Sequence, residues 1–143
     1  MTKDVIVTLS GTQYLSADEP EEPIELITSG VYEQKDGVHE IVYEEVFEGF
    51  EEYPTLNVVR IDGNTLSVEK KGAVSVDMVF EPGKMSYSGY ETPFGVIEMG
   101  IRTSALDISI GEKEIHVLAE YTLSMNGEGT ADCVLKLKAV SRG

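Results

Sequence analysis

The chain has 143 residues, 41% of them hydrophobic, and its 26 acidic and 11 basic side chains give a formal net charge of −15 at pH 7. A chain of this length and apolar content can bury one core, which excludes a wholly disordered protein. The absence of lysine and arginine clusters argues against nucleic acid and an anionic membrane surface as partners, because such clusters are what bind phosphate groups.

The first residues of the chain bear on where the protein resides. Residues 1–4 pass directly into a strand-like stretch at 5–9, and no segment resembles a signal peptide or a transmembrane helix. The chain has one cysteine, Cys133, whereas small secreted barrels often carry disulfides. We therefore expect a cytoplasmic protein.

Alternating apolar and polar residues predict strands along most of the chain, and no helical period of any length is found. The first strands are expected at residues 3–15, 24–35, 38–47, 56–61, 65–71 and 74–80. Two acidic connections, 16–23 and 48–54, interrupt them. The first contains two prolines and is the best candidate for local disorder.

The Asp36-Gly37 pair is a strong signal for a two-residue hairpin turn. Pairing across this turn places one set of side chains on the inward face of both strands. The predicted inward set is Leu26, Thr28, Gly30, Tyr32, Ile41, Tyr43, Glu45 and Phe47. Glu45 is the one charged member of this set.

Residues 85–103 predict a further hairpin, whose turn decides which side chains face the core. In Thr92-Pro93-Phe94-Gly95 the proline suits the first turn position and the glycine a left-handed residue, which predicts a three-residue loop with a bulge. This loop places Met85, Tyr87, Gly89, Ile97, Met99, Ile101 and Thr103 inward, and Ser86, Ser88, Tyr90, Glu98, Gly100 and Arg102 outward. A two-residue Pro82-Gly83 turn is expected to pair Phe80 with Met85 and Met78 with Tyr87.

Beyond Thr103 the apolar positions continue one residue out of step, at Leu106, Ile108 and Ile110, with no glycine for a tight turn. This shift predicts a β-bulge at residues 103–105 that bends one long strand.

The last strands are expected around residues 115–123 and 131–137. A meander of hairpins closes when the strand near Leu135 pairs with the first strand near Val7, and closure hides every strand edge. We therefore predict one domain over residues 1–143, all-β, folded as a single antiparallel meander β-barrel of about 8–10 strands.

Short motifs carry a resemblance that spans nearly the whole chain. They are Tyr43-Glu44-Glu45, Lys70-x-Gly72, Met78-x-Phe80, Tyr90-x-Thr92-Pro93-Phe94-Gly95, Met99-x-Ile101-x-Thr103 and Tyr121-x-Leu123. In this order they resemble the YwiB-like family of small bacterial proteins. The resemblance implies a calycin or lipocalin-like antiparallel barrel, and the family is one of unknown function.

Side chains with catalytic or metal-binding chemistry are sparse. Cys133 lies between apolar residues at strand spacing, so an inert buried thiol is expected, opposite Tyr121 across the 126–128 loop. His39 and His116 have no second ligand at zinc spacing, and the acidic runs lack the ligand order of a calcium loop. We expect no metal, no cofactor and no catalytic residue. Whether the protein is an enzyme stays open, with a non-catalytic role favoured.

Two kinds of side chain are predicted to face the barrel interior. An aromatic set, which either fills the interior or lines a ligand cavity, consists of Tyr32, Tyr43, Phe47, Phe80, Tyr87 and Tyr121. Glu45 and Lys70 also face inward, and an interior carboxylate and ammonium must pair or be hydrated. We predict that these two form a polar contact, with the hydroxyl of Tyr43 or Tyr121 nearby.

Such a pair favours a modest cavity, because polar groups on an interior face are tolerated best where water or a polar head group reaches them. We predict a small amphipathic ligand, its apolar body toward Met99 and Ile101 and its polar end toward Glu45 and Lys70. The predicted ligand-binding residues are Tyr32, Tyr43, Glu45, Lys70, Tyr87, Met99, Ile101 and Tyr121. The alternative is a non-catalytic interaction module that presents its acidic loops to a basic protein partner, and the sequence does not indicate an oligomeric state.

Overall fold

The computed structural model describes residues 3–16, 19–20, 24–46, 49 and 51–142. Its strands, in chain order, are β1 (Asp4–Ser16), β2 (Glu19–Pro20), β3 (Ile24–Lys35), β4 (Val38–Glu45), β5 (Thr55–Asp62), β6 (Thr65–Lys71), β7 (Val76–Phe80), β8 (Met85–Thr92), β9 (Gly95–Ile110), β10 (Glu114–Met125) and β11 (Glu128–Ser141). The described part of the chain has no helix long and apolar enough to cross a membrane.

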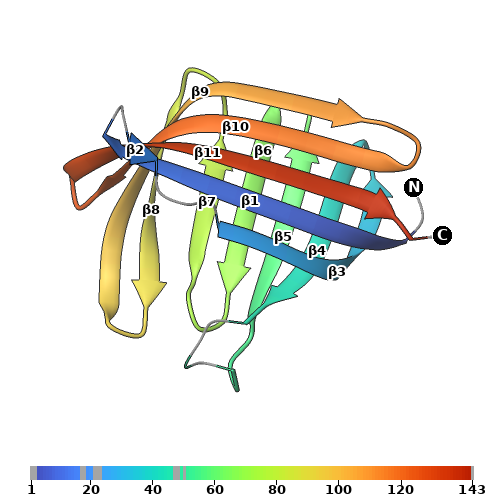
Figure 1. Ribbon diagram of the computed structural model, residues 1–143, viewed down its shortest axis with the longest axis horizontal. Coiled ribbons are helices and arrows are strands. Elements are labelled where there is room, and N and C mark those ends of the chain that lie inside the picture. Colours follow the sequence, from blue (N-terminus) through green and yellow to red (C-terminus); the bar gives the residue numbers. More distant parts are fainter. Residues whose placement is uncertain (1–2, 17–18, 21–23, 47–48, 50, 143) are drawn as a thin grey trace.

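All strands belong to one antiparallel sheet with the order β7-β6-β5-β4-β3-β1-β11-β10-β9-β8, and the short β2 pairs with β1. The sheet curls on itself, so that β1, β11, β10 and β9 cross in front of β4 to β7 in Figure 1. The predicted closure between the first and last strands is confirmed, because Val7 pairs with Ala139 and Gly11 with Leu135. The all-β antiparallel barrel predicted from the sequence is therefore the observed fold.

The barrel remains incomplete at the seam between β7 and β8. Among the described residues the seam is joined by one isolated bridge, in which Ser75, just before β7, and Glu91 on β8 exchange backbone hydrogen bonds of 2.9 and 2.8 Å. The predicted two-residue Pro82-Gly83 turn is present, since the Lys84 N–H donates to the Glu81 carbonyl at 3.0 Å. The strand pairing predicted across this turn is wrong, because Gly83 and Lys84 bond the backbone of Thr103 on β9 instead. Tyr87 and Met78 are consequently not paired: Tyr87 lies opposite Gly100, and Met78 opposite Val68. The barrel is thus nearly closed rather than closed.

Local turn chemistry accounts for the other connections. At the β3–β4 turn, Asp36 and Gly37 have φ of 53° and 81°, the conformation a two-residue turn with two left-handed residues needs. The turn after β10 repeats this geometry at Asn126 and Gly127, with φ of 52° and 72°. The predicted bulge is confirmed at Ser104, since Ala105 pairs with Glu120 while Thr103 pairs with Tyr121.

The register predicted for the β8–β9 hairpin is wrong. Thr92 pairs with Gly95, so the loop is two residues, Pro93 and Phe94, and the hydroxyl of Thr92 accepts from the Phe94 N–H at 3.1 Å and donates to the Gly95 carbonyl at 2.8 Å. Strand β9 still faces Ile97, Met99, Ile101 and Thr103 inward, but every residue of β8 is reversed. Ser86, Ser88 and Tyr90 face the interior, whereas Met85, Tyr87 and Gly89 face outward.

A physical reason for the reversed register lies at Gly100, on the outer face of β9. A Cβ atom there would stand 3.0 Å from Met85 Cε and 3.3 Å from Tyr87 Cε1, so the missing side chain makes room for both. Both side chains remain partly covered on the outside, although Tyr87 is still 66% exposed.

The core fills the space enclosed by the sheet. Its members are contributed by every long strand except β8, with partly buried side chains packed around them. The largest fully buried apolar side chains are Phe80, Ile41, Ile61, Leu66, Ile115, Val5, Val7 and Val59. The predicted inward set of β3 and β4 holds for its described members, since Tyr32 pairs with Ile41. Phe47, residues 17–18 and 21–23 of the first acidic connection, and residues 48 and 50 of the second lie outside the described residues.

Candidate functional site

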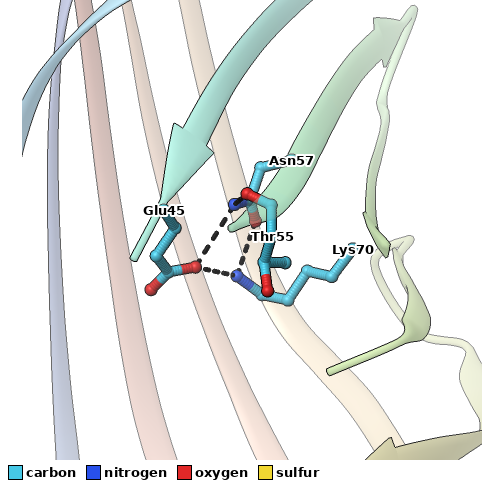
Figure 2. A network of polar contacts seen from close by, with 4 residues as sticks. All are labelled: Glu45, Thr55, Asn57 and Lys70. Carbon is cyan, nitrogen blue, oxygen red and sulfur yellow. Dashed lines mark hydrogen bonds and ion pairs between the residues drawn. The ribbon is translucent and has the colours of Figure 1, made fainter. Parts of the chain in front are cut away.

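Three side chains on neighbouring strands form a hydrogen-bonded network at one end of the barrel (Figure 2). The Lys70 ammonium donates to Glu45 Oε1 at 3.0 Å and to Asn57 Oδ1 at 2.6 Å, and Asn57 Nδ2 donates to Glu45 Oε1 at 3.2 Å. We call Glu45, Asn57 and Lys70 the polar cluster. The predicted contact between Glu45 and Lys70 is confirmed.

Strand pairing explains why these residues meet. Asn57 is the cross-strand partner of both Tyr43 on β4 and Lys70 on β6, and Glu45 is the last residue of β4, two positions beyond Tyr43. Asn57 is fully buried, while the side chains of Glu45 and Lys70 keep 22% and 16% of their exposure. The cluster therefore sits between the dry core and the barrel end.

Thr55 lies beside the polar cluster in Figure 2. Its carbonyl accepts a long hydrogen bond of 3.5 Å from Asn57 Nδ2, but its fully buried hydroxyl has no hydrogen-bond partner among the described residues. The backbone at Gly72 packs directly against this corner, because a Cβ atom there would lie 2.4 Å from the Pro54 carbonyl oxygen. The corner is thus tightly built and leaves one buried polar atom unsatisfied.

Two tyrosines lie close enough to the cluster to sense the charge of Glu45: Tyr43 on β4 and Tyr90 on β8. Burial raises the pKa of Tyr43 well above its ordinary value, and the charge of Glu45 adds to this effect. Burial, followed by the charge of Glu45, also raises the pKa of Tyr90 on β8. Because β8 turns Ser86 and Ser88 inward with Tyr90, this strand adds three hydroxyl groups to the interior.

The strands that follow β4 in the sheet, β3, β1 and β11, contribute apolar side chains to the interior. Leu9, Leu26 and Leu135, which we call the leucine wall, are half-buried and pack against the core. They come from β1, β3 and β11, and Leu9 pairs directly with Leu26. Next to them, a Cβ atom built at Gly11, the cross-strand partner of Leu135, would meet no atom of the described side chains within 4 Å. Among the described residues, Gly11 therefore leaves room beside the leucine wall.

A pocket of about 310 Å³ lies at the incomplete seam between β7 and β8. Its lining includes Lys70 and Ser88 from the inner face together with Glu69, Gly89 and Glu91 from the outer one. A recess large enough for a small molecule therefore borders the residue that carries the cluster's ammonium.

The structure brings some of the predicted ligand-binding residues together and separates others. Tyr43, Glu45 and Lys70 meet, and Met99 and Ile101 lie fully packed in the core. Tyr121 is half-buried, edge-on to Phe80 with ring centroids 4.9 Å apart.

Two predicted ligand-binding residues lie away from the polar cluster. Tyr32 sits near the Asp36-Gly37 turn, at the end of the β3–β4 hairpin remote from Glu45, where its hydroxyl bonds His39 Nδ1 at 2.6 Å and the two rings stack. Tyr87 is on the outer face, because the two-residue hairpin loop reverses the faces of β8.

The thiol of Cys133 is buried, as predicted, and is paired across the ladder with Tyr121. Burial raises its pKa, which keeps it protonated. Within the described ranges, no group of three histidine, cysteine or carboxylate side chains is placed to hold a metal ion.

Sequence reasoning missed Asn57, Ser86, Ser88 and Tyr90. Asn57 could have been found, because it alternates with the buried Val59 and Ile61 along β5. The β8 residues could not be recovered once the hairpin loop had been assigned three residues, since a shift of one residue turns every side chain to the opposite face.

Comparisons with known proteins agree with the fold. A family model described as "Domain of unknown function (DUF1934)" matches residues 7–137. The chain is 23% identical over 128 residues to the uncharacterized beta-barrel protein YwiB of Bacillus subtilis (strain 168), covering 90% of this chain and 88% of YwiB. The crystal structure of the B. subtilis ywiB protein superposes with a TM-score of 0.85 at 17% identity, covering 99% of this chain and 93% of that one. The resemblance predicted from the motifs is confirmed.

Proposed function

We propose that this chain, which belongs to the DUF1934 family, binds a small amphipathic molecule inside its barrel, with the polar end of the ligand at the polar cluster. The observation that carries this proposal is the placement of Glu45, Asn57 and Lys70 on an interior face, where the side chains of Glu45 and Lys70 keep part of their exposure. A barrel that served only as a scaffold would be at least as stable with apolar residues of similar size there, because desolvation offsets much of the attraction in a buried ion pair.

The apolar side chains on β3, β1 and β11 support an amphipathic rather than a wholly polar ligand. The leucine wall keeps part of its apolar surface uncovered, and an alkyl or aromatic body laid against it would remove that surface from water. Met99 and Ile101, which we expected to contact the apolar body, are already covered by protein, so the leucine wall takes their place in the proposal.

A matched pair of glycine substitutions tests where a ligand binds. Gly11→Leu would place an isobutyl group in the open space beside Leu135, whereas Gly89→Leu would place the same group on the outer face, where a Cβ atom would make an ordinary 3.5 Å contact with Val96. Neither glycine has a positive φ, so leucine is compatible with both backbones.

The readout is fluorescence of prodan, an uncharged amphipathic dye whose emission shifts to the blue in apolar surroundings. We expect saturable binding to the wild type and to Gly89→Leu, and at least about tenfold weaker binding to Gly11→Leu, equivalent to ~1.4 kcal/mol. Circular dichroism checks that both variants are folded. Equal binding by Gly11→Leu and the wild type, or no saturable binding by the wild type, would overturn the proposal.

A protein-interaction role is the second candidate function, and the reversed β8 register favours it. Met85, Tyr87 and Val96 form an exposed apolar patch on the outer face of β8 and β9, near the 91% exposed Phe94 at the hairpin tip. Contiguous exposed apolar side chains often mark contact surfaces. Sedimentation equilibrium of the wild type and of a Tyr87→Ser/Val96→Ser variant tests whether a second copy covers this patch: a dimer that the double substitution abolishes supports this role.

A further inference from the structure

We infer that the barrel selects ligands whose head group is uncharged and carries both a hydrogen-bond donor and an acceptor, such as a primary carboxamide, over carboxylates and amines of the same length. This inference rests on the proposed function, because it names the class of ligand that the same site takes.

The first argument is the charge balance of the polar cluster. Glu45 and Lys70 neutralise each other at 3.0 Å, and Asn57 bonds both partners without adding charge. A charged head group would be attracted by one member of the pair and repelled by the other at nearly the same distance. The cluster therefore offers a ligand no net charge to compensate its own.

The second argument is the hydrogen-bonding capacity that the cluster leaves. The Lys70 ammonium has three protons, and Glu45 Oε1 and Asn57 Oδ1 accept two of them. The contacts within the cluster engage Oε1 of Glu45, so the capacity of Oε2 is not used there. The buried Thr55 hydroxyl is unpartnered among the described residues and can act as donor or acceptor. The remaining N–H of Lys70 and the carboxylate oxygen Oε2 of Glu45 are one donor and one acceptor, which match the carbonyl oxygen and the N–H₂ group of an amide.

The third argument is the cost of dehydration. Asn57 and Thr55 are fully buried, and Glu45 and Lys70 are mostly so, which makes the surroundings of a bound head group poor in water. An uncompensated charge moved into such surroundings loses far more hydration free energy than an amide that regains its hydrogen bonds. The preference is thus produced by rejection of charge as well as by recognition of the amide.

Three ligands with the same alkyl chain test the inference: octanamide, octanoate and octylamine at pH 7 and 0.15 M salt. Binding to the full-length protein is followed by backbone chemical-shift titration, which also locates each ligand. The locating step matters for octylamine, because the net charge of −15 draws cations to the outer surface. We expect octanamide to bind the interior at least about tenfold more tightly than either charged analogue.

Charge-changing variants of the cluster should shift this preference in opposite directions. Glu45→Gln keeps an acceptor for Lys70 and Asn57 but leaves the cluster with a net positive charge, so octanoate should gain about tenfold or more relative to octanamide. Lys70→Met leaves a net negative charge, so octylamine should gain instead. Lys71→Met, which removes an exposed neighbouring ammonium on the outer face, is the control and should change no interior preference.

The outcomes separate the inference from the proposed function. If no octyl compound shifts resonances of interior residues in the wild type, the proposed function fails. If octanoate or octylamine binds the wild-type interior as tightly as octanamide does, the barrel still binds amphipathic molecules but the inference is wrong. Glu45→Gln is the decisive variant if Lys70→Met proves unfolded, since an unchanged preference in Glu45→Gln would also refute the charge-balance argument.

Discussion

Removal of the Lys70 ammonium tests whether the polar cluster contributes to stability as its geometry implies. In Lys70→Met, Asn57 Oδ1 loses its 2.6 Å donor while fully buried, which costs about 1–3 kcal/mol for an unsatisfied acceptor. Glu45 also loses its partner. One-sided loss of a fully buried pair costs about 3–5 kcal/mol, but the 22% exposure of Glu45 lets water recover part of this. We expect a total destabilisation of about 2–3 kcal/mol.

For a chain of this length, 1 kcal/mol corresponds to about 3 °C in Tm, so the midpoint should fall by ~6–9 °C. Urea unfolding followed by circular dichroism gives the free energy directly. The control is Lys71→Met on the same strand: its ammonium pairs with Glu69 but is 69% exposed, so its loss should change the free energy of unfolding far less than the loss of Lys70. If Lys70→Met is no more destabilising than Lys71→Met, the cluster is effectively solvated and the reasoning fails.

Three further predictions concern other parts of the fold. Cys133 should react with a thiol reagent at least about a hundredfold more slowly in the native protein than in urea, because the thiol is buried with a raised pKa; equal rates would contradict the β11 register. Gly72→Ala should lower the free energy of unfolding in urea by about 3 kcal/mol, since its Cβ would collide with the Pro54 carbonyl. Gly83→Ala, with open space around it, should cost ~1 kcal/mol from positive φ alone. Equal costs would contradict the close contact between Gly72 and Pro54. Burial raises the pKa of Tyr43 above its ordinary 10.0, so its contribution to stability is complete below pH 10 and is lost at higher pH. Tyr43→Phe should therefore reduce the fall in unfolding free energy between about pH 9 and 11. An identical fall in the wild type and the variant would show that Tyr43 is not involved.

Features set by short-range chemistry were predictable from the sequence. Asp36-Gly37 specifies a two-residue turn because both residues adopt positive φ readily, and the turn then fixes which face Tyr43 and Glu45 occupy. The bulge at Ser104 was visible as a one-residue shift in the apolar pattern. Where a strand has one clearly apolar face, the alternation of its side chains between the two faces was therefore sufficient to place Glu45 and Lys70 on the interior side.

The β8 register was not predictable in the same way, because β8 has no clearly apolar face. Met85 and Tyr87 alternate with Ser86, Ser88 and Tyr90, so the sequence alone favoured the wrong set. Gly100 on the neighbouring strand leaves room for the outward Met85 and Tyr87 side chains, and this contact between strands leaves no periodic signal along β8. The consequence for the site is direct, since the hydroxyl groups of β8 became part of the interior.

The account depends most on the claim that the interior holds an amphipathic ligand between the polar cluster and the leucine wall. Intermolecular NOEs between octanamide and the methyl-labelled protein test this claim directly. The account predicts NOEs from the octyl chain to Leu9, Leu26 and Leu135, and from the amide protons to the ring of Tyr90, at an affinity of roughly 0.1–1 mM for a ligand of this size. NOEs confined to outward methyl groups such as those of Ile27 or Val96, or none at millimolar ligand, would contradict it.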